Sequence, residues 1–152
     1  MAVHIETTNT QVTAPWCLVV DTNVVLDLWV FRDGGTDSVA AAAADLRWNW
    51  LGSPAMRDEL QRVLSYALIA AQLDLNRATV AQVLERYDGC VRRVHAPPRC
   101  SAICKDPDDQ KFIDLAVQHR AVLLSKDKAV LALKRKLAVL GVSAIKPHEF
   151  QG

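Results

Sequence analysis

The stretch "WCLVVDTNVV", residues 16–25, runs from apolar residues into a polar triplet and back into apolar residues. Leu18, Val19 and Val20 are the branched apolar residues typical of a strand buried on both faces. Asp21 follows at the point where such a strand ends. The pattern predicts a buried parallel strand whose carboxyl end carries an acidic side chain.

A second stretch, "AVLLSKD", residues 121–127, repeats this pattern of a short apolar run followed by polar residues and an acid. It predicts another buried strand, with Ser125 and Asp127 just beyond its end. Residues 91–97 and 142–145 are two further strand candidates. Helical patterns separate these strands, which favours an α/β fold with a central, mainly parallel sheet.

The helical patterns are marked by caps and breakers. A run of alanines predicts a helix over residues 38–51 with Ser38 as its cap, and Ser53 followed by Pro54 predicts the start of another over 53–68. Apolar residues at helical spacing predict further helices over residues 80–89 and 110–119. A basic amphipathic helix over 128–140 is expected to end at Gly141.

The composition is that of an ordinary globular domain: the chain has 152 residues, of which 51% are hydrophobic and 23% are charged. We expect a polar lead-in over residues 1–15 and a single domain over residues 16–152. With a net charge of only +1, the protein as a whole does not attract nucleic acid electrostatically. Any binding of nucleic acid must therefore use local patches of positive charge. No apolar run approaches the ~20 residues of a membrane span, and no secretion signal is evident, so we expect a cytoplasmic protein.

The four cysteines, Cys17, Cys90, Cys100 and Cys104, are expected to be reduced thiols. Cys100 and Cys104 lie downstream of His95 and raise the alternative of a zinc site. A structural zinc site usually needs a second closely spaced pair of ligands, and this pair is missing.

Four acids from four separate segments are predicted to meet. In open α/β sheets ligands bind beyond the carboxyl ends of the strands, where Asp21 and Asp127 should both lie. Asp109 is placed at the start of the next helix, and Glu59 lies early in its helix. Two carboxylates ~4 Å apart repel by roughly 1 kcal/mol in water and about 4 kcal/mol at an effective dielectric of 20, so converging acids need a cation.

Carboxylate ligands suit Mg²⁺ or Mn²⁺ rather than Zn²⁺, and such ions support phosphodiester hydrolysis. Each acid also has a plainer explanation, because helix capping and the helix dipole account for any one of them alone. Asp106 and Asp108 flank Pro107 in a typical turn arrangement. Capping does not explain why two strands end in acids beside this cluster.

Five stretches together resemble PIN-domain proteins, and most closely the branch of toxins from toxin–antitoxin pairs. They are "LVVDTNVVLDLWVF", "MRDELQRVL", "CKDPDDQKFIDLAV", "AVLLSKDKAVLAL" and "IKPHEF", and the resemblance runs from about residue 17 to residue 150. It implies a PIN-like three-layer α/β/α fold. It also implies a metal-dependent endoribonuclease, which is a hydrolase that uses Mg²⁺ or Mn²⁺.

Carried over position by position, the resemblance assigns the catalytic and metal-binding acids as Asp21, Glu59, Asp109 and Asp127. Asn23 and Ser125 match polar positions that tie the acidic loops together. Asp106 is assigned a supporting, outer position, and Asp108 is interpreted as the helix cap.

RNA contact is expected from basic residues near the acids, with the alternative that they only pair with neighbouring carboxylates. Trp29 and Trp50 would stack on bases or, as the helical spacing favours, pack in the core. The basic candidates are Arg32, Arg57, Lys105, Lys126 and Lys128.

The expected partners are a single-stranded RNA substrate, an antitoxin protein and a second copy of the chain in a homodimer. A different class of function stays open, in which the protein is a partner-regulated PIN-fold binding protein with little or no nuclease activity. A receiver-like phosphoacceptor domain also uses acids at strand ends, but it needs paired acids after the first strand, and Asp21 has no acidic neighbour.

Overall fold

The computed structural model describes residues 16–152, and the predicted lead-in over residues 1–15 lies outside the described residues. Five strands form one sheet: β1 (Trp16–Val20), β2 (Trp48–Gly52), β3 (Val91–Arg93), β4 (Val122–Leu124) and β5 (Ser143–Ile145). The helices are α2 (Thr22–Trp29), α3 (Asp37–Ala43), α4 (Pro54–Val63), α5 (Ala67–Leu75), α6 (Val80–Cys90), α7 (Gln110–His119), α8 (Lys128–Leu131) and α9 (Lys134–Val139). Short 3₁₀ turns are η1 (Gly34–Thr36), η2 (Pro107–Asp109) and η3 (Pro147–Glu149). Within this part of the chain, no helix is long and apolar enough to cross a membrane.

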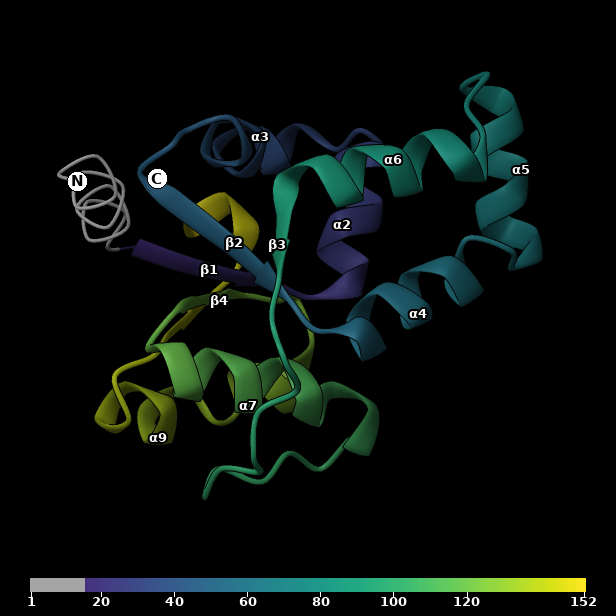
Figure 1. Ribbon diagram of the computed structural model, residues 1–152. Helices are drawn as coiled ribbons and strands as arrows, with labels where there is room; N and C mark the ends of the chain where they lie inside the picture. Colours follow the sequence, from purple (N-terminus) through teal and green to yellow (C-terminus); the bar gives the residue numbers. More distant parts are fainter. Residues whose placement is uncertain (1–15) are drawn as a thin grey trace, which may run out of the picture.

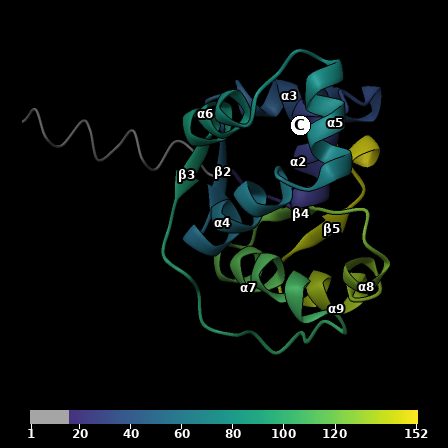
Figure 2. The ribbon, with the colours of Figure 1, turned by 90° about the vertical axis from the view of Figure 1, so that its right-hand side faces the viewer.

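The sheet is parallel throughout, in the order β3-β2-β1-β4-β5. Helices α2, α3 and α6 cover one face, and α7 and α9 cover the other (Figure 1; Figure 2). All five strands therefore present their carboxyl ends at one edge. This confirms the predicted α/β fold with helices on both faces of a parallel sheet.

Alternating side chains of β1 explain why helices are needed on both faces. Leu18 and Val20 belong to one apolar cluster, with residues of α2 and α6, whereas Val19 belongs to the other, with Phe112 and Ile113 of α7. Successive strand residues point to opposite faces, so a strand of consecutive apolar residues is stable only when both faces are covered.

Trp29 and Trp50 lie in the first of these clusters rather than on an RNA-binding surface. Their rings stack with centroids 5.4 Å apart, and their side chains are 9% and 3% exposed. The core-packing interpretation is therefore confirmed for both tryptophans.

The predicted helix over residues 38–51 is wrong in its second half and in its cap. Helix α3 starts one residue before Ser38 and ends at Ala43, and Trp48–Gly52 forms β2, which pairs with both β1 and β3. Alanine favours the helix locally, but the aromatic side chains after Arg47 pack better on a pleated surface, and pairing on both sides decides the outcome.

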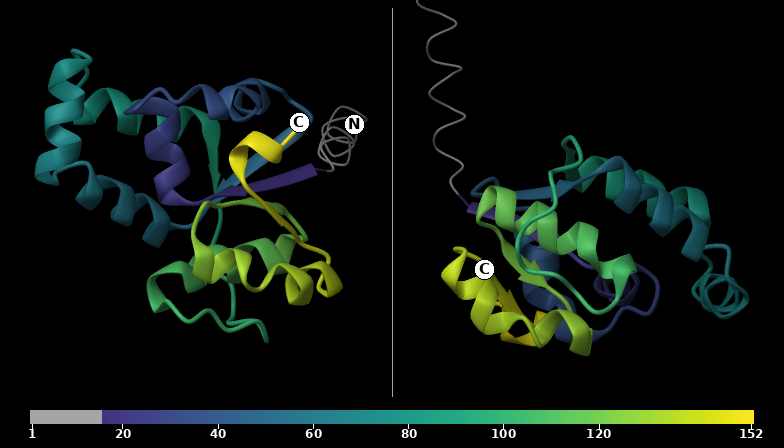
Figure 3. Two further views of the ribbon diagram at one scale, coloured as in Figure 1. Left: turned by 180° about the vertical axis from the view of Figure 1, so that it is seen from behind. Right: turned by 90° about the horizontal axis from the view of Figure 1, so that it is seen from below.

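Two other predicted helices are interrupted. Residues 53–68 form α4 and the start of a separate helix, α5, which lies far from the sheet (Figure 1; Figure 3). The basic stretch is divided into α8 and α9, and Gly141 follows α9 with a φ of +88°, as expected of a glycine after a helix end.

Gly52 is required where β2 ends. A Cβ atom there would lie 2.6 Å from Tyr87 Oη and 2.8 Å from Val91 Cγ1. We predict that Gly52→Ala lowers the free energy of unfolding by about 1–3 kcal/mol, because both neighbours must move. Urea unfolding measures this change.

Gly89→Ala is the matched control, because no atom lies within 4 Å of a Cβ at that position in α6. The helix should gain roughly 0.5–1 kcal/mol from this alanine. Equal effects of the two substitutions would contradict the steric explanation.

Candidate metal centre

Asp21 is held at the carboxyl edge by the ends of two neighbouring strands. Its backbone N–H donates to the Leu124 carbonyl at 3.0 Å, and its carboxylate Oδ2 accepts a hydrogen bond from Ser125 Oγ at 2.7 Å. Asp21 is also the N-cap residue of α2, but its side chain makes no capping hydrogen bond. Asp21 is 3% exposed, and the hydrogen bond from Ser125 orients its carboxylate.

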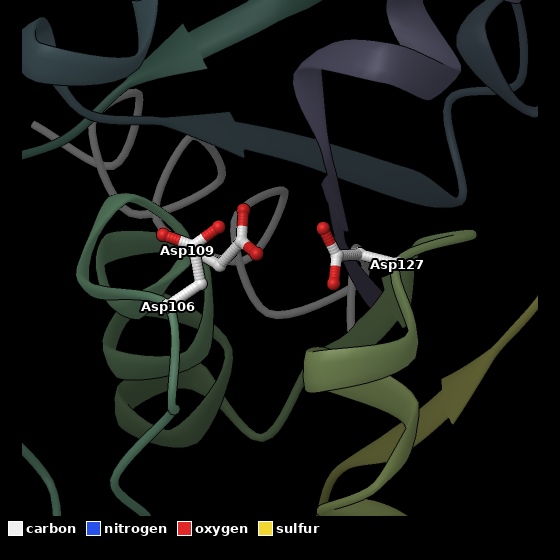
Figure 4. Close-up of side chains that lie close together, drawn as sticks. All are labelled: Asp106, Asp109 and Asp127. Atoms are coloured by element: carbon white, nitrogen blue, oxygen red, sulfur yellow. The ribbon is translucent and has the colours of Figure 1, made fainter.

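Three other carboxylates lie close together at the same edge. One oxygen from each of Asp106, Asp109 and Asp127 lies within 4.8 Å of the others, and Figure 4 shows the side chains of Asp106 and Asp109 facing that of Asp127. Asp109 is buried, and its Oδ2 atom has no hydrogen-bond partner among the described residues. An unpartnered buried carboxylate oxygen is costly unless a cation binds it.

Asp127 caps a helix with its side chain and contacts Ser125 with its backbone. Its Oδ1 atom accepts a hydrogen bond from the Ala129 N–H at 2.8 Å and so caps α8, as one alternative interpretation expected. Its backbone N–H donates to Ser125 Oγ at 3.1 Å. Ser125 therefore links the carboxylate of Asp21 to the backbone of Asp127.

Burial, together with the neighbouring charges, raises the pKa of two acids of the cluster. The pKa of Asp109 is raised to about 7, first by burial, then by the negative charge of Asp21, by a hydrogen bond with Asp127 and by the charges of Asp127 and Asp106. The pKa of Asp21 is also raised, chiefly by burial, with the Ser125 hydrogen bond acting against the shift and the Glu59 charge adding to it. These acids lie near enough to one another to resist simultaneous ionisation.

Glu59 lies at the border of the cluster, outside the group of three oxygens. It comes from α4 and forms an ion pair with Lys111 of α7, with 2.6 Å between Oε1 and Nζ. Its charge nonetheless reaches Asp21, whose pKa it helps to raise. Asn23 lies exposed in the first turn of α2.

The assignment of Asp108 as the helix cap is wrong. The capping oxygen belongs to Asp106, whose Oδ1 accepts the Asp108 N–H at 3.0 Å at the start of η2. Asp106 is exposed and also contributes an oxygen to the group of three. Asp108 is exposed and outside that group.

The family profile of the PIN domain matches residues 17–129, which include every acid described above. The chain belongs to the PIN domain family. PIN domains are metal-dependent nucleases, and the acidic cluster of this PIN domain is consistent with the divalent metal site typical of the family. The search of curated proteins found no match.

The donor atoms fit a hard divalent cation. The group consists only of carboxylate oxygens, and one of them, Asp109 Oδ2, is buried without a partner. Mg²⁺ and Mn²⁺ favour such ligands, whereas Zn²⁺ favours sulfur and nitrogen. Across residues 16–152 this is the only such group of histidine, cysteine or acidic side chains, so the zinc alternative finds no support, and the four cysteines are unpaired thiols.

Two of the predicted RNA-contacting cations are paired with acids. Arg57 donates two hydrogen bonds to Asp88, at 2.7 and 2.8 Å, and Lys126 forms an ion pair with Asp27. Arg32, Lys105 and Lys128 are exposed. Arg57 and Lys126 of this PIN domain therefore pair with neighbouring carboxylates, which was the alternative to RNA contact.

Gln110 is a site-shaping residue that the sequence patterns did not reveal. Its buried amide accepts the Cys104 N–H at 2.7 Å and donates to the Ala102 carbonyl and to Asp114 Oδ1, both at 2.9 Å. Asp114 Oδ1 also accepts the Cys100 N–H at 3.0 Å. These bonds fasten the loop that leads into Asp106 to the helix that follows Asp109.

We predict that Asp109→Asn stabilises the metal-free protein at pH 8. Because the folded pKa of about 7 exceeds the ordinary value of 3.8, the wild type loses stability as the pH rises from about 4 to 7. The variant lacks this loss, so its Tm should be several degrees higher at pH 8, at about 2–4 °C per kcal/mol, with a smaller difference at pH 5.

The same thermal scans with added Mg²⁺ or Mn²⁺ test metal binding. The ion should raise the Tm of the wild type at pH 8 and change that of Asp109→Asn much less, since binding to the folded state stabilises it. A wild-type Tm unaffected by either metal would show that the cluster is not a cation site.

We predict that Gln110→Leu weakens Mn²⁺ binding by about 10- to 100-fold, the usual effect of removing a side chain that orients metal ligands. The leucine leaves the Cys104 N–H without its acceptor and frees the loop before Asp106. Isothermal titration calorimetry measures the affinity, and Gln118→Leu, at an exposed position of α7, is the matched control. Equal Mn²⁺ affinities of Gln110→Leu and Gln118→Leu would show that Gln110 does not position the metal ligands.

Proposed function

We propose that this PIN domain is a metal-dependent endoribonuclease that hydrolyses phosphodiester bonds of single-stranded RNA. The observation that supports this most strongly is the group of three carboxylate oxygens with the unpartnered Oδ2 of Asp109. The proposed catalytic set is Asp21, Glu59, Asp109 and Asp127, and the geometry adds Asp106.

The chain's own residues would hold and orient the reacting groups. Asp106, Asp109 and Asp127 would bind Mg²⁺ or Mn²⁺, and Ser125 would orient Asp21 beside them. A divalent ion bound there would supply charge stabilisation for the phosphate and would activate water. The raised pKa values of Asp21 and Asp109 favour a proton on one of them until a cation offsets the repulsion.

The choice of RNA and the biological role rest on the resemblance of the sequence motifs to the toxin branch. We propose that the protein is the toxin of a toxin–antitoxin pair that acts in the cytoplasm, with an antitoxin protein as its partner and a homodimer as its assembly. These are proposals about partners, and the acidic cluster supports only the nuclease chemistry.

A second candidate function is that of a partner-regulated binding protein, and α5 favours it. Seven of the nine residues of α5 are apolar; Ile69 and Leu73 are buried, whereas Leu68 and Leu75 are 84% and 76% exposed near its two ends. Exposed large apolar side chains on a projecting helix are typical of a surface that another protein covers. The same surface would suit a nuclease that an antitoxin or a second copy contacts.

We predict that the wild type cleaves a mixed single-stranded RNA in the presence of Mg²⁺ or Mn²⁺ and that Asp109→Asn lowers the rate by at least about 100-fold. Gel separation of labelled fragments measures the rate. Asp108→Asn is the matched control, because it removes the neighbouring charge outside the group of three oxygens and should retain near-wild-type cleavage.

Three outcomes distinguish the candidates. Loss of cleavage in Asp109→Asn alone, with circular dichroism unchanged, supports the nuclease. Equal cleavage by all three proteins points to a contaminating ribonuclease and contradicts the assignment of the site. A wild type that binds Mn²⁺ but cleaves no RNA favours the partner-regulated protein.

A further inference from the structure

A hollow of about 300 Å³ lies at the same edge of the sheet as the acids, on the side of β2 and β3. Arg93 is level with Gly52 in the β2–β3 register, and Trp50 is level with Leu18 in the β1–β2 register. The ends of β3 and β1 are therefore two strand spacings apart, about 10 Å. The hollow is lined by Gly52, Ser53, Arg57, Tyr87, Asp88, Val91 and Arg93.

Helix α4 is a wall shared by this hollow and the acidic site. Arg57 and Glu59 are two positions apart on α4, so they lie on different sides of the helix. Glu59 forms its ion pair with Lys111 on the side of the acids, and Arg57 binds Asp88 of α6 on the side of the hollow. The two regions therefore lie on opposite sides of the same helix.

The lining of the hollow has one cation more than it has carboxylates, and it has a neutral donor. Arg93 is exposed and makes no close ion pair with a described residue, although its charge helps to lower the pKa of Asp88, whereas the Arg57 guanidinium is held by two hydrogen bonds to Asp88. The hydroxyl of Tyr87 lies over Gly52, where only a residue without a Cβ fits. Burial raises the pKa of Tyr87 to about 12, so the phenol stays protonated at neutral pH.

We propose that this hollow binds one nucleotide of single-stranded RNA next to the scissile phosphate, with Arg93 contacting its phosphate and Tyr87 and Ser53 facing its sugar and base. The proposal rests on the proposed nuclease function and adds a substrate subsite to it. A volume of about 300 Å³ is at the lower end of small-ligand sites, so it suits a single nucleotide and not a stack of bases. The cation, the neutral hydroxyls and the apolar wall of Val91 match the chemistry of that unit.

The test measures binding of a fluorescein-labelled single-stranded RNA of about eight nucleotides by anisotropy, in the uncleaving Asp109→Asn background. Adding Arg93→Gln should weaken binding about tenfold at low salt and reduce the slope of log K against log salt by about 0.7, the loss of one single-strand phosphate contact. Arg135→Gln, at an exposed position of α9 on the other side of the sheet, is the matched control and should leave both quantities unchanged.

In the cleavage assay, Arg93→Gln should act mainly by raising the KM for RNA. Equal affinity and salt slope in the Arg93→Gln and Arg135→Gln proteins would overturn the subsite even if RNA is cleaved. Binding that depends on Arg93 in a wild type that cleaves nothing would keep the subsite and reject the nuclease. A protein that neither binds nor cleaves RNA would reject both.

Discussion

The repulsion among carboxylates gathered at one edge of a parallel sheet is the constraint on which the rest of the structure depends. Parallel strands place all of their carboxyl ends together, so acids after β1 and β4 are forced into one region. The fold tolerates this partly through hydrogen bonds. Ser125 donates to Asp21 across 104 residues of sequence, and Asp127 accepts from the backbone of α8. Burial first, and then the charges that these bonds leave in place, raise the pKa of Asp109.

The same geometry makes the site rigid. Asp21 follows β1, Asp127 follows β4 and starts α8, and Phe112 and Ile113 anchor α7 shortly after Asp109; Asp106 precedes η2 at the surface. Gln110 and Asp114 then tie the preceding loop to that helix through three hydrogen bonds, and a fourth joins the two side chains to each other. The acids are thus held close together by backbone elements whose stability comes from apolar burial. Such preorganisation lets a cation bind without first ordering the site.

The sequence was sufficient to predict the features that depend on local pattern. Apolar runs that stop at an acid identified β1 and β4, and the parallel topology then placed Asp21 and Asp127 at one edge. It was insufficient where tertiary contacts decide. The interior strand β2 was assigned to a helix because alanines dominate the local propensity, whereas its pairing with β1 and β3 is visible only in three dimensions. Tertiary contacts also distinguish Asp106 from Asp108, which flank the same proline in the sequence. Only Asp106 caps η2 and contributes an oxygen to the acidic group.

The balance of charge near the site is the physical argument for the proposed cation and for the proposed role of Arg93. The net charge of +1 gives no long-range attraction. Near the edge, Lys111 is paired with Glu59, Lys126 with Asp27, and Arg57 with Asp88, so these cations offer little net positive potential to a phosphate. A phosphodiester approaching the acids would be repelled unless a divalent ion offsets their charge. The proposed role of Arg93 follows from the same balance. Arg93 lines the hollow beyond α4 and forms no ion pair with a described residue, so its charge can attract a phosphate there.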